Sequence, residues 1–148
     1  MKRFWILTIP LVFLLVPQLG YSQCKNFAKK ICKSELAPYL HDGNYNAAIL
    51  TEGEDAELFK TFYAGQEYRI AVCASNALPK VEFILMDTQR KVLYTNKDNN
   101  YAVFYDFKAE TTQMLIISVK VNSKSSTAAA DELVSGCVAI MFGLKMPK

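Results

Sequence analysis

Apolar and polar side chains alternate with a period of two in a series of short segments between residues 47 and 145. Such alternation is typical of strands that bury one face and expose the other. Turn-forming residues interrupt the pattern about every ten residues, which favours an all-β antiparallel sandwich. The segments predict eight strands, at 47–50, 56–63, 67–73, 80–86, 91–95, 101–107, 113–121 and 137–145.

The apolar parity of these strands predicts the core between the two sheets. Burying one such side chain is worth roughly 1.5–3 kcal/mol, so this face should supply most of the stability. The predicted core residues are Tyr68, Ile70 and Val72; Val81, Phe83 and Leu85; Leu115, Ile117 and Val119; and Val138, Ile140 and Phe142. The same rule directs Tyr101, Val103, Tyr105 and Phe107 of the strand at 101–107 into the core.

A different periodicity, of three and four residues, predicts one helix over residues 24–36, which ends before Pro38. Lysine side chains lie on its polar face, and we expect its apolar face to pack on the sandwich. That apolar face consists of Cys24, Phe27, Ala28, Ile31, Cys32 and Leu36.

The chain has four cysteines, Cys24, Cys32, Cys73 and Cys137, and an even number in an exported chain favours disulfides. On one helix, Cys24 and Cys32 would be about 12 Å apart. That separation exceeds the roughly 7 Å between Cα atoms that a disulfide allows. Either the two helix cysteines bond to Cys73 and Cys137, or Cys73 and Cys137 bond to each other. Four reduced, buried thiols are the remaining alternative.

The first 22 residues are predicted to be a secretory signal. Lys2 and Arg3 precede an apolar run over 4–16, and small residues at Gly20 and Ser22 suit cleavage after Ser22. The run is shorter than the roughly 20 residues that span a bilayer, so we expect no transmembrane segment after cleavage. The mature protein should be periplasmic or secreted. Attachment of a lipid to Cys24 is a minor alternative, because the preceding Gln23 is not a small residue.

Charge argues against a nucleic-acid partner. The chain has 17 basic and 14 acidic residues, and two of the basic ones lie in the predicted signal, which leaves a net charge of +1. A nearly neutral chain lacks the electrostatic footprint of a nucleic-acid-binding protein. Residues 23–148 are long enough for one domain with its own core.

Candidate catalytic groups are few. The one histidine, His41, lies in an Asp-Gly turn, and the chain has neither a GxSxG nor an HExxH motif. The acidic cluster Glu52, Glu54, Asp55 and Glu57 could serve glycoside hydrolysis or calcium binding, but its hairpin position is typical of solvated charges. We therefore expect no enzyme activity, no cofactor and no metal.

The Ser-, Ala- and Thr-rich segment 122–136 is predicted to be the one long loop.

Three residues near the middle of the chain are candidates for a ligand face: Tyr94, Phe104 and Asp106. Phe104 and Asp106 fall on the parity opposite the predicted core. An exposed ring beside a carboxylate is the kind of pair that stacks on and hydrogen-bonds a sugar. The competing interpretation is an apolar face that the helix or a partner covers.

Segment 63–72 (YAGQEYRIAV), with its glycine turn before a Tyr-x-Ile strand, resembles the opening of the bacterial pre-peptidase C-terminal domain. Segment 83–87 (FILMD) resembles the middle strand of that family, and 113–121 and 138–142 stand where its last strands would be. The resemblance covers roughly 56–145 and implies a non-catalytic, jelly-roll-like sandwich. The added helix, the cysteines and the lack of a protease domain resemble small exported proteins of Bacteroidetes more closely.

Together these observations predict a non-catalytic exported module that interacts with an unidentified protein or glycan in the cell envelope. A structural subunit of an exported assembly is the first alternative. A hydrolase with an unrecognised site is the second.

Overall fold

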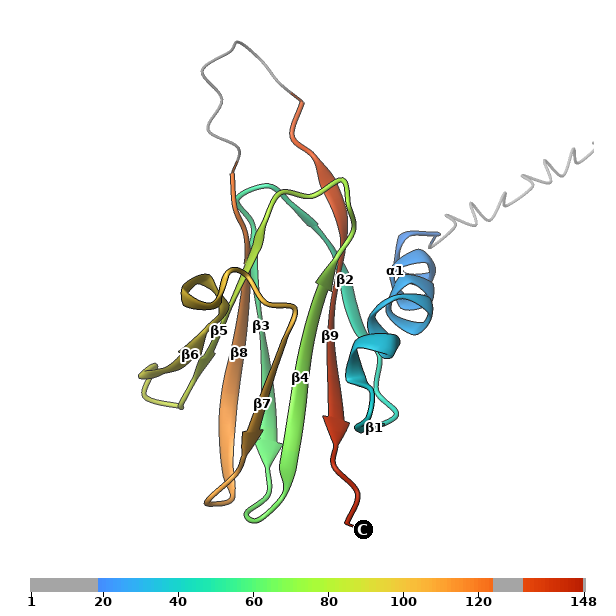
Figure 1. The fold of residues 1–148 in the computed structure, drawn as a ribbon. Helices are drawn as coiled ribbons and strands as arrows, with labels where there is room; N and C mark the ends of the chain where they lie inside the picture. Colours follow the sequence, from blue (N-terminus) through green and yellow to red (C-terminus); the bar gives the residue numbers. More distant parts are fainter. Residues whose placement is uncertain (1–18, 124–131, 148) are drawn as a thin grey trace, which may run out of the picture.

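The computed structural model describes residues 19–123 and 132–147 and is a β-sandwich of two antiparallel sheets (Figure 1). The first sheet contains β1 (Leu40–His41), β2 (Asn46–Thr51), β9 (Ser135–Leu144), β4 (Glu67–Ala74) and β7 (Phe104–Lys108). The second sheet contains β3 (Asp55–Phe62), β8 (Gln113–Val121), β5 (Val81–Met86) and β6 (Val92–Thr95).

The order of the strands is that of a jelly roll. Both β1 and β2 pair with β9, so they form a single sheet edge that is interrupted by the turn at 42–45. The first sheet therefore runs β2-β9-β4-β7 and faces β3-β8-β5-β6 in the second. The predicted all-β antiparallel sandwich is confirmed. The predicted number of strands is wrong, because the described residues form nine: Leu40 and His41 add a short pair with Leu144 and Gly143.

The core lies between the sheets and includes the residues that the alternation predicts, although Val81 is only partly buried. It also contains Leu50, Phe62, Leu78, Ala109 and Val121, which were not among the predicted core residues. Tyr68, Ile70, Phe83, Ile117 and Phe142 are almost completely buried there. In β8, odd-numbered residues face this core and even-numbered ones face the opposite side, so the period of two is the direct cause of the burial.

A helical segment covers the outer face of the first sheet. It consists of α1 (Leu19–Lys30) and the 3-10 helix η1 (Cys32–Leu36), and Figure 1 shows it beside β2 and β9. Small side chains of β4 and β9 allow the close approach, and the buried cluster comprises Ala28, Cys32, Leu36, Ala71, Cys73, Ala139 and Met141. Strands β4 and β9 are consequently buried on both faces.

Two disulfides join this segment to the sheet. Cys24 bonds to Cys137 and Cys32 bonds to Cys73, which is the helix-to-sheet arrangement and not the strand-to-strand one. The thiol of Cys24 is therefore not available for a lipid. Disulfides of this kind form in oxidising compartments, which agrees with export.

The predicted N-terminal helix on one face of the sandwich is confirmed, but its continuous run over 24–36 is wrong in two respects. The α-helix ends at Lys30 and a 3-10 turn follows, so the backbone rotates before the second cysteine. Ile31, predicted on the apolar face, is instead 55% exposed.

The predicted strand 101–107 begins only at Phe104. Asn96–Asn99 form the 3-10 helix η2, and the next two residues, Asn100 and Tyr101, have left-handed backbone (φ 53° and 56°). Tyr105 and Phe107 pack against the core as predicted, but Val103 is exposed and Tyr101 is outside the strand.

Residues 1–18, most of the predicted signal, and 124–131 of the predicted loop lie outside the described residues. The last four signal residues, 19–22, belong to α1, so cleavage after Ser22 stays a prediction. Within the described residues, no helix combines the length and apolar character that crossing a bilayer requires.

Candidate functional site

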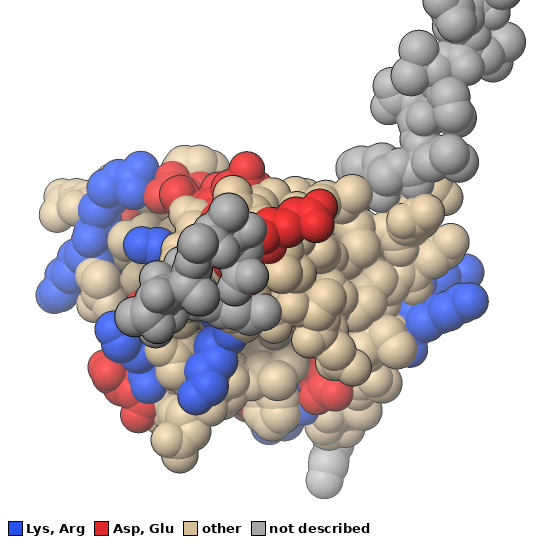
Figure 2. Space-filling model, turned by 90° about the horizontal axis from the view of Figure 1, so that it is seen from above, with Lys and Arg blue, Asp and Glu red and all other residues tan. Residues whose placement is uncertain are grey.

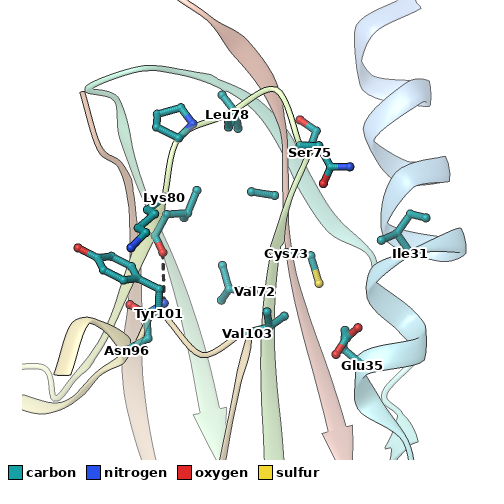
Figure 3. A pocket seen from close by; sticks show the side chains of 14 residues that line it. Ile31, Glu35, Val72, Cys73, Ser75, Leu78, Lys80, Asn96, Tyr101 and Val103 are labelled. Carbon is teal, nitrogen blue, oxygen red and sulfur yellow. Dashed lines mark hydrogen bonds between the residues drawn. The ribbon is translucent and has the colours of Figure 1, made fainter. Parts of the chain in front are cut away.

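A groove lies at one edge of the sandwich, between the two sheets and beside η1 (Figure 3). It has a volume of about 450 Å³, and we call it the edge groove. Its lining residues are Ile31, Glu35, Val72, Cys73, Ala74, Ser75, Asn76, Leu78, Pro79, Lys80, Val81, Asn96, Tyr101 and Val103. It is thus open to a ligand of the size that protein pockets commonly take.

The edge groove exists because β7 stops short of the end of β4. The last hydrogen bond between them runs from Val72 N–H to the C=O of Val103, at 2.8 Å. Before Val103, the chain turns away at Tyr101, whose N–H donates to the C=O of Asn96. The end of β4, at Ala74, is therefore a free sheet edge that lines the groove.

Buried Asn96 holds this arrangement in place. Its side-chain oxygen accepts from Phe83 N–H at 2.9 Å, and its amide nitrogen donates to the C=O groups of Val81 and Ala102. Because every one of these groups would otherwise lose a partner on burial, Asn96 acts as a structural clamp between β5 and the turn before β7.

Opposite charges lie at the two sides of the edge groove. Lys80 places its ammonium 4.9 Å from the centroid of the Tyr101 ring. Glu35 of η1, labelled on the opposite side in Figure 3, is half-buried, and its carboxylate makes no hydrogen bond or ion pair within the described residues. The lining therefore combines apolar side chains, such as Leu78 and Val81, with a cation on one side and a carboxylate on the other.

The three predicted ligand-face residues do not come together. Tyr94 lies between the sheets, where its ring stacks on Tyr105 with centroids 3.8 Å apart and burial raises the pKa of its hydroxyl. Phe104 and Asp106 are neighbours on the outer face of the first sheet, and both contact Arg69. The guanidinium covers one face of the Phe104 ring, at 3.9 Å from its centroid. A ligand-binding role for these residues stays a prediction.

The candidate catalytic residues have structural partners. His41 Nε2 lies 2.9 Å from the C=O of Asn44 within its turn, and it does not line the edge groove. In the acidic cluster, Glu54 accepts from Thr51 N–H, while Glu57 accepts two hydrogen bonds from Arg90, which lower the pKa of its carboxyl. Nowhere in the described part of the chain do three His, Cys, Asp or Glu side chains gather as a metal site would require.

The outer face of the second sheet carries an apolar row without a covering helix (Figure 1). Phe59, Ile116, Met86 and Val92 lie opposite one another across β3, β8, β5 and β6. Phe59 and Val92, at the two ends of this row, are more than half exposed.

The surface charge of the molecule is mixed. Viewed from above, the visible face carries both acidic and basic side chains, and neither sign predominates (Figure 2).

No protein-family model and no curated protein matches the chain. The resemblance to the pre-peptidase C-terminal domain and to Bacteroidetes proteins therefore stays a prediction. Among solved structures, the chain is similar to PliG of Aeromonas hydrophila, a periplasmic lysozyme inhibitor of g-type lysozyme. The TM-score is 0.50 at 10% identity, over 73% of this chain and 89% of PliG. At 10% identity, this similarity is evidence of a shared fold and not of a shared function.

Sequence reasoning missed the edge groove. The alternation of residues 101–107 continues a strand pattern, so it gave no sign that the chain turns away at Asn100. The Asn-Asn pair at 99–100 was the available signal, because asparagine is enriched in left-handed backbone. The comparisons and the geometry together identify the chain as an all-β sandwich whose candidate site is a groove at a free sheet edge.

Proposed function

We propose that this chain is an exported, non-catalytic module that binds a partner protein in the edge groove. The observation that carries the proposal is the groove itself, an apolar hollow with a free main-chain edge and opposite charges on its rims. Protein interfaces combine such an apolar centre with a polar rim.

The lining side chains support binding rather than catalysis. They include amides, hydroxyls, an amine and one carboxylate, but no histidine. A catalytic nucleophile needs an adjacent base. The cysteine in the lining, Cys73, is in a disulfide and therefore cannot serve as a nucleophile. Two disulfides, together with the predicted signal over 1–22, support an exported protein.

Inhibition of a lysozyme is the second, narrower candidate function. The similarity to PliG favours it, since the name of that protein states that it inhibits g-type lysozyme. Fold similarity alone does not transfer a function, so a direct assay is needed. Purified chain added in molar excess should slow the lysis of bacterial cell walls by a g-type lysozyme. Unchanged lysis would rule out this candidate and leave the binding module in place.

Site-specific photo-crosslinking tests the main proposal. Val103 in the edge groove is replaced by p-benzoylphenylalanine, and Val92 on the outer face of the second sheet is the matched control, because both valines are exposed (41% and 53%). In cells of the source organism, the proposal predicts one discrete protein adduct from position 103 and none from position 92. Equal adducts from both positions, or adducts only from 92, would contradict it.

A further inference from the structure

The register of β4 and β7 defines which main-chain groups of β4 face the edge groove. On a strand of an antiparallel pair, every second residue directs its N–H and C=O to the same neighbour. Val72 bonds to Val103 on the β7 side, so Ala74 is the next residue to face that side. Ser75 N–H donates to the C=O of Cys137 in β9, which confirms the alternation.

Ala74 has no strand partner on the β7 side. The register would place Tyr101 opposite it, but the N–H of Tyr101 bonds to Asn96, and the N–H of Ala102 bonds to Asn99. Within the described residues, the N–H and C=O of Ala74 therefore remain available at the floor of the groove. A free edge of this kind is a template for the backbone of another chain.

We propose that the edge groove takes an extended segment of the partner protein, which adds to β4 as a strand beyond the end of β7. The inference rests on the proposed function, because it specifies how the partner occupies the same groove. Main-chain hydrogen bonds would supply affinity, and pockets on alternate sides would supply specificity, as in other cases of strand addition.

The two sides of the groove specify the side chains of that segment. Even-numbered residues of β4, such as Val72 and Ala74, face the space between the sheets, whereas Cys73 faces the helical segment. A side chain opposite Ala74 would point inward to Leu78 and Val81, where an apolar group is required. Its neighbours along the segment would point outward, toward the side of η1.

The negative charge of Glu35 favours a basic residue among the side chains of the bound segment that point outward. The Glu35 carboxylate is half-buried and attracts the Arg69 guanidinium at longer range, but it makes no hydrogen bond or close ion pair in the described chain, so a basic side chain there would gain a charge-assisted hydrogen bond. Lys80, at the other rim, already lies over the Tyr101 ring. The occupant is therefore an extended peptide segment in which an apolar residue has a lysine or arginine as its neighbour.

A peptide selection with an exchange measurement tests this mode of binding. A phage-displayed library of random linear heptapeptides is selected on the folded full-length exported protein, and enriched peptides are synthesised. We expect them to share an apolar residue next to a basic one. By NMR, amide hydrogen exchange of the Ala74 N–H should slow on binding by about tenfold or more, since that group becomes hydrogen-bonded.

Variants of the edge provide the second readout. Ala74→Pro removes the free N–H without removing a hydrogen bond of the sheet, and edge strands tolerate proline at such positions. It should weaken peptide binding by about 2- to 10-fold, the value of one hydrogen bond, whereas Ala74→Ser, which keeps the N–H, should bind as before. Glu35→Gln should weaken binding of the basic peptides and lower the melting temperature only slightly, since it keeps the main-chain contact with Arg69 and loses only a longer-range attraction.

The outcomes separate the two proposals. Peptides that bind while exchange of the Ala74 N–H stays fast, or a library without any enriched binder, would overturn strand addition. If position 103 still gave its specific crosslink, the proposed function would stand and a folded surface of the partner, or a glycan on it, would be the occupant. Loss of both the crosslink and the peptide binding would overturn both.

Discussion

Arg69 binds Asp106 through both carboxylate oxygens, with Nε 2.6 Å from Oδ1 and Nη2 2.7 Å from Oδ2. The remaining nitrogen, Nη1, donates to the C=O groups of Glu35 and Ala37, at 3.2 and 2.6 Å. One side chain of β4 thus joins the edge strand β7 to the C-terminal end of η1. The planar fork of arginine makes this possible, because it directs several donors in fixed directions.

Replacement of this arginine tests how much the junction contributes. Arg69→Lys keeps the charge but loses the paired hydrogen bonds, so the free energy of unfolding should fall by about 1–3 kcal/mol. Urea denaturation measures the change. Lys145→Ala, which removes the exposed ion pair with Glu67, is the control and should change little. A loss for Lys145→Ala as large as that for Arg69→Lys would mean that the junction has no special role.

Reduction of the disulfides should lower the melting temperature. Each crosslink restricts the unfolded chain, and removing one typically costs about 2–4 kcal/mol. The paired replacement of Cys32 and Cys73 by alanine isolates one crosslink, because alanine suits the small-residue face on which both cysteines lie. Calorimetric scans with and without reductant make the comparison. The crosslinks are absent if all four thiols react with maleimide in unreduced protein and the melt does not change.

The core assignment predicts different effects at two adjacent residues of β8. Ile117 is fully buried between the sheets, so Ile117→Ala should cost about 2–5 kcal/mol, and Ile117→Asp should abolish folding. Ser118 faces the other side and is half-exposed, so Ser118→Ala should stay within about 0.5 kcal/mol of wild type. A soluble Ile117→Asp variant with a cooperative melt would refute the assignment.

Stability should depend on pH through Asp42. Burial alone would raise the pKa of its carboxyl, but hydrogen bonds from the Lys60 ammonium and from Asn44 N–H lower that pKa below the ordinary value of 3.8. A pKa that is lower in the folded state gives stability that is complete above 3.8 and is lost as the pH falls through the folded value.

The Asp42→Asn variant isolates this effect. Its free energy of unfolding should be lower than that of wild type at pH 6, and the difference should shrink as the pH falls toward 3 in urea titrations. A difference of constant size over that range would show that Asp42 makes no pH-dependent contribution.

The β-sandwich can be predicted from the sequence, because burial of one strand face imposes a period of two on the apolar residues of each strand. The sequence also excludes a bond between Cys24 and Cys32, since residues eight apart on a helix cannot bond to each other. The choice between helix-to-sheet disulfides and a Cys73–Cys137 bond depends on tertiary packing. The edge groove is different. It depends on two successive left-handed residues, Asn100 and Tyr101, and nothing in the apolar pattern marks tyrosine for that conformation.

The end of the helix illustrates the same limit. Ile31 fits a continuous helical face, but the change to a 3-10 helix after Lys30 turns it outward, beside the groove. Likewise Arg69, in a strand pattern, gives no sign of its contact with a segment more than thirty residues earlier. Such contacts follow from tertiary packing and not from local pattern.

A calorimetric titration measures whether a partner protein binds in the edge groove. The partner crosslinked from position 103 is purified and titrated calorimetrically into wild type, Val103→Arg and Val92→Arg. Because an arginine in the groove blocks its mouth, Val103→Arg should lose at least about tenfold in affinity, while Val92→Arg should bind as wild type does. Equal affinity of wild type and Val103→Arg would contradict binding in the edge groove.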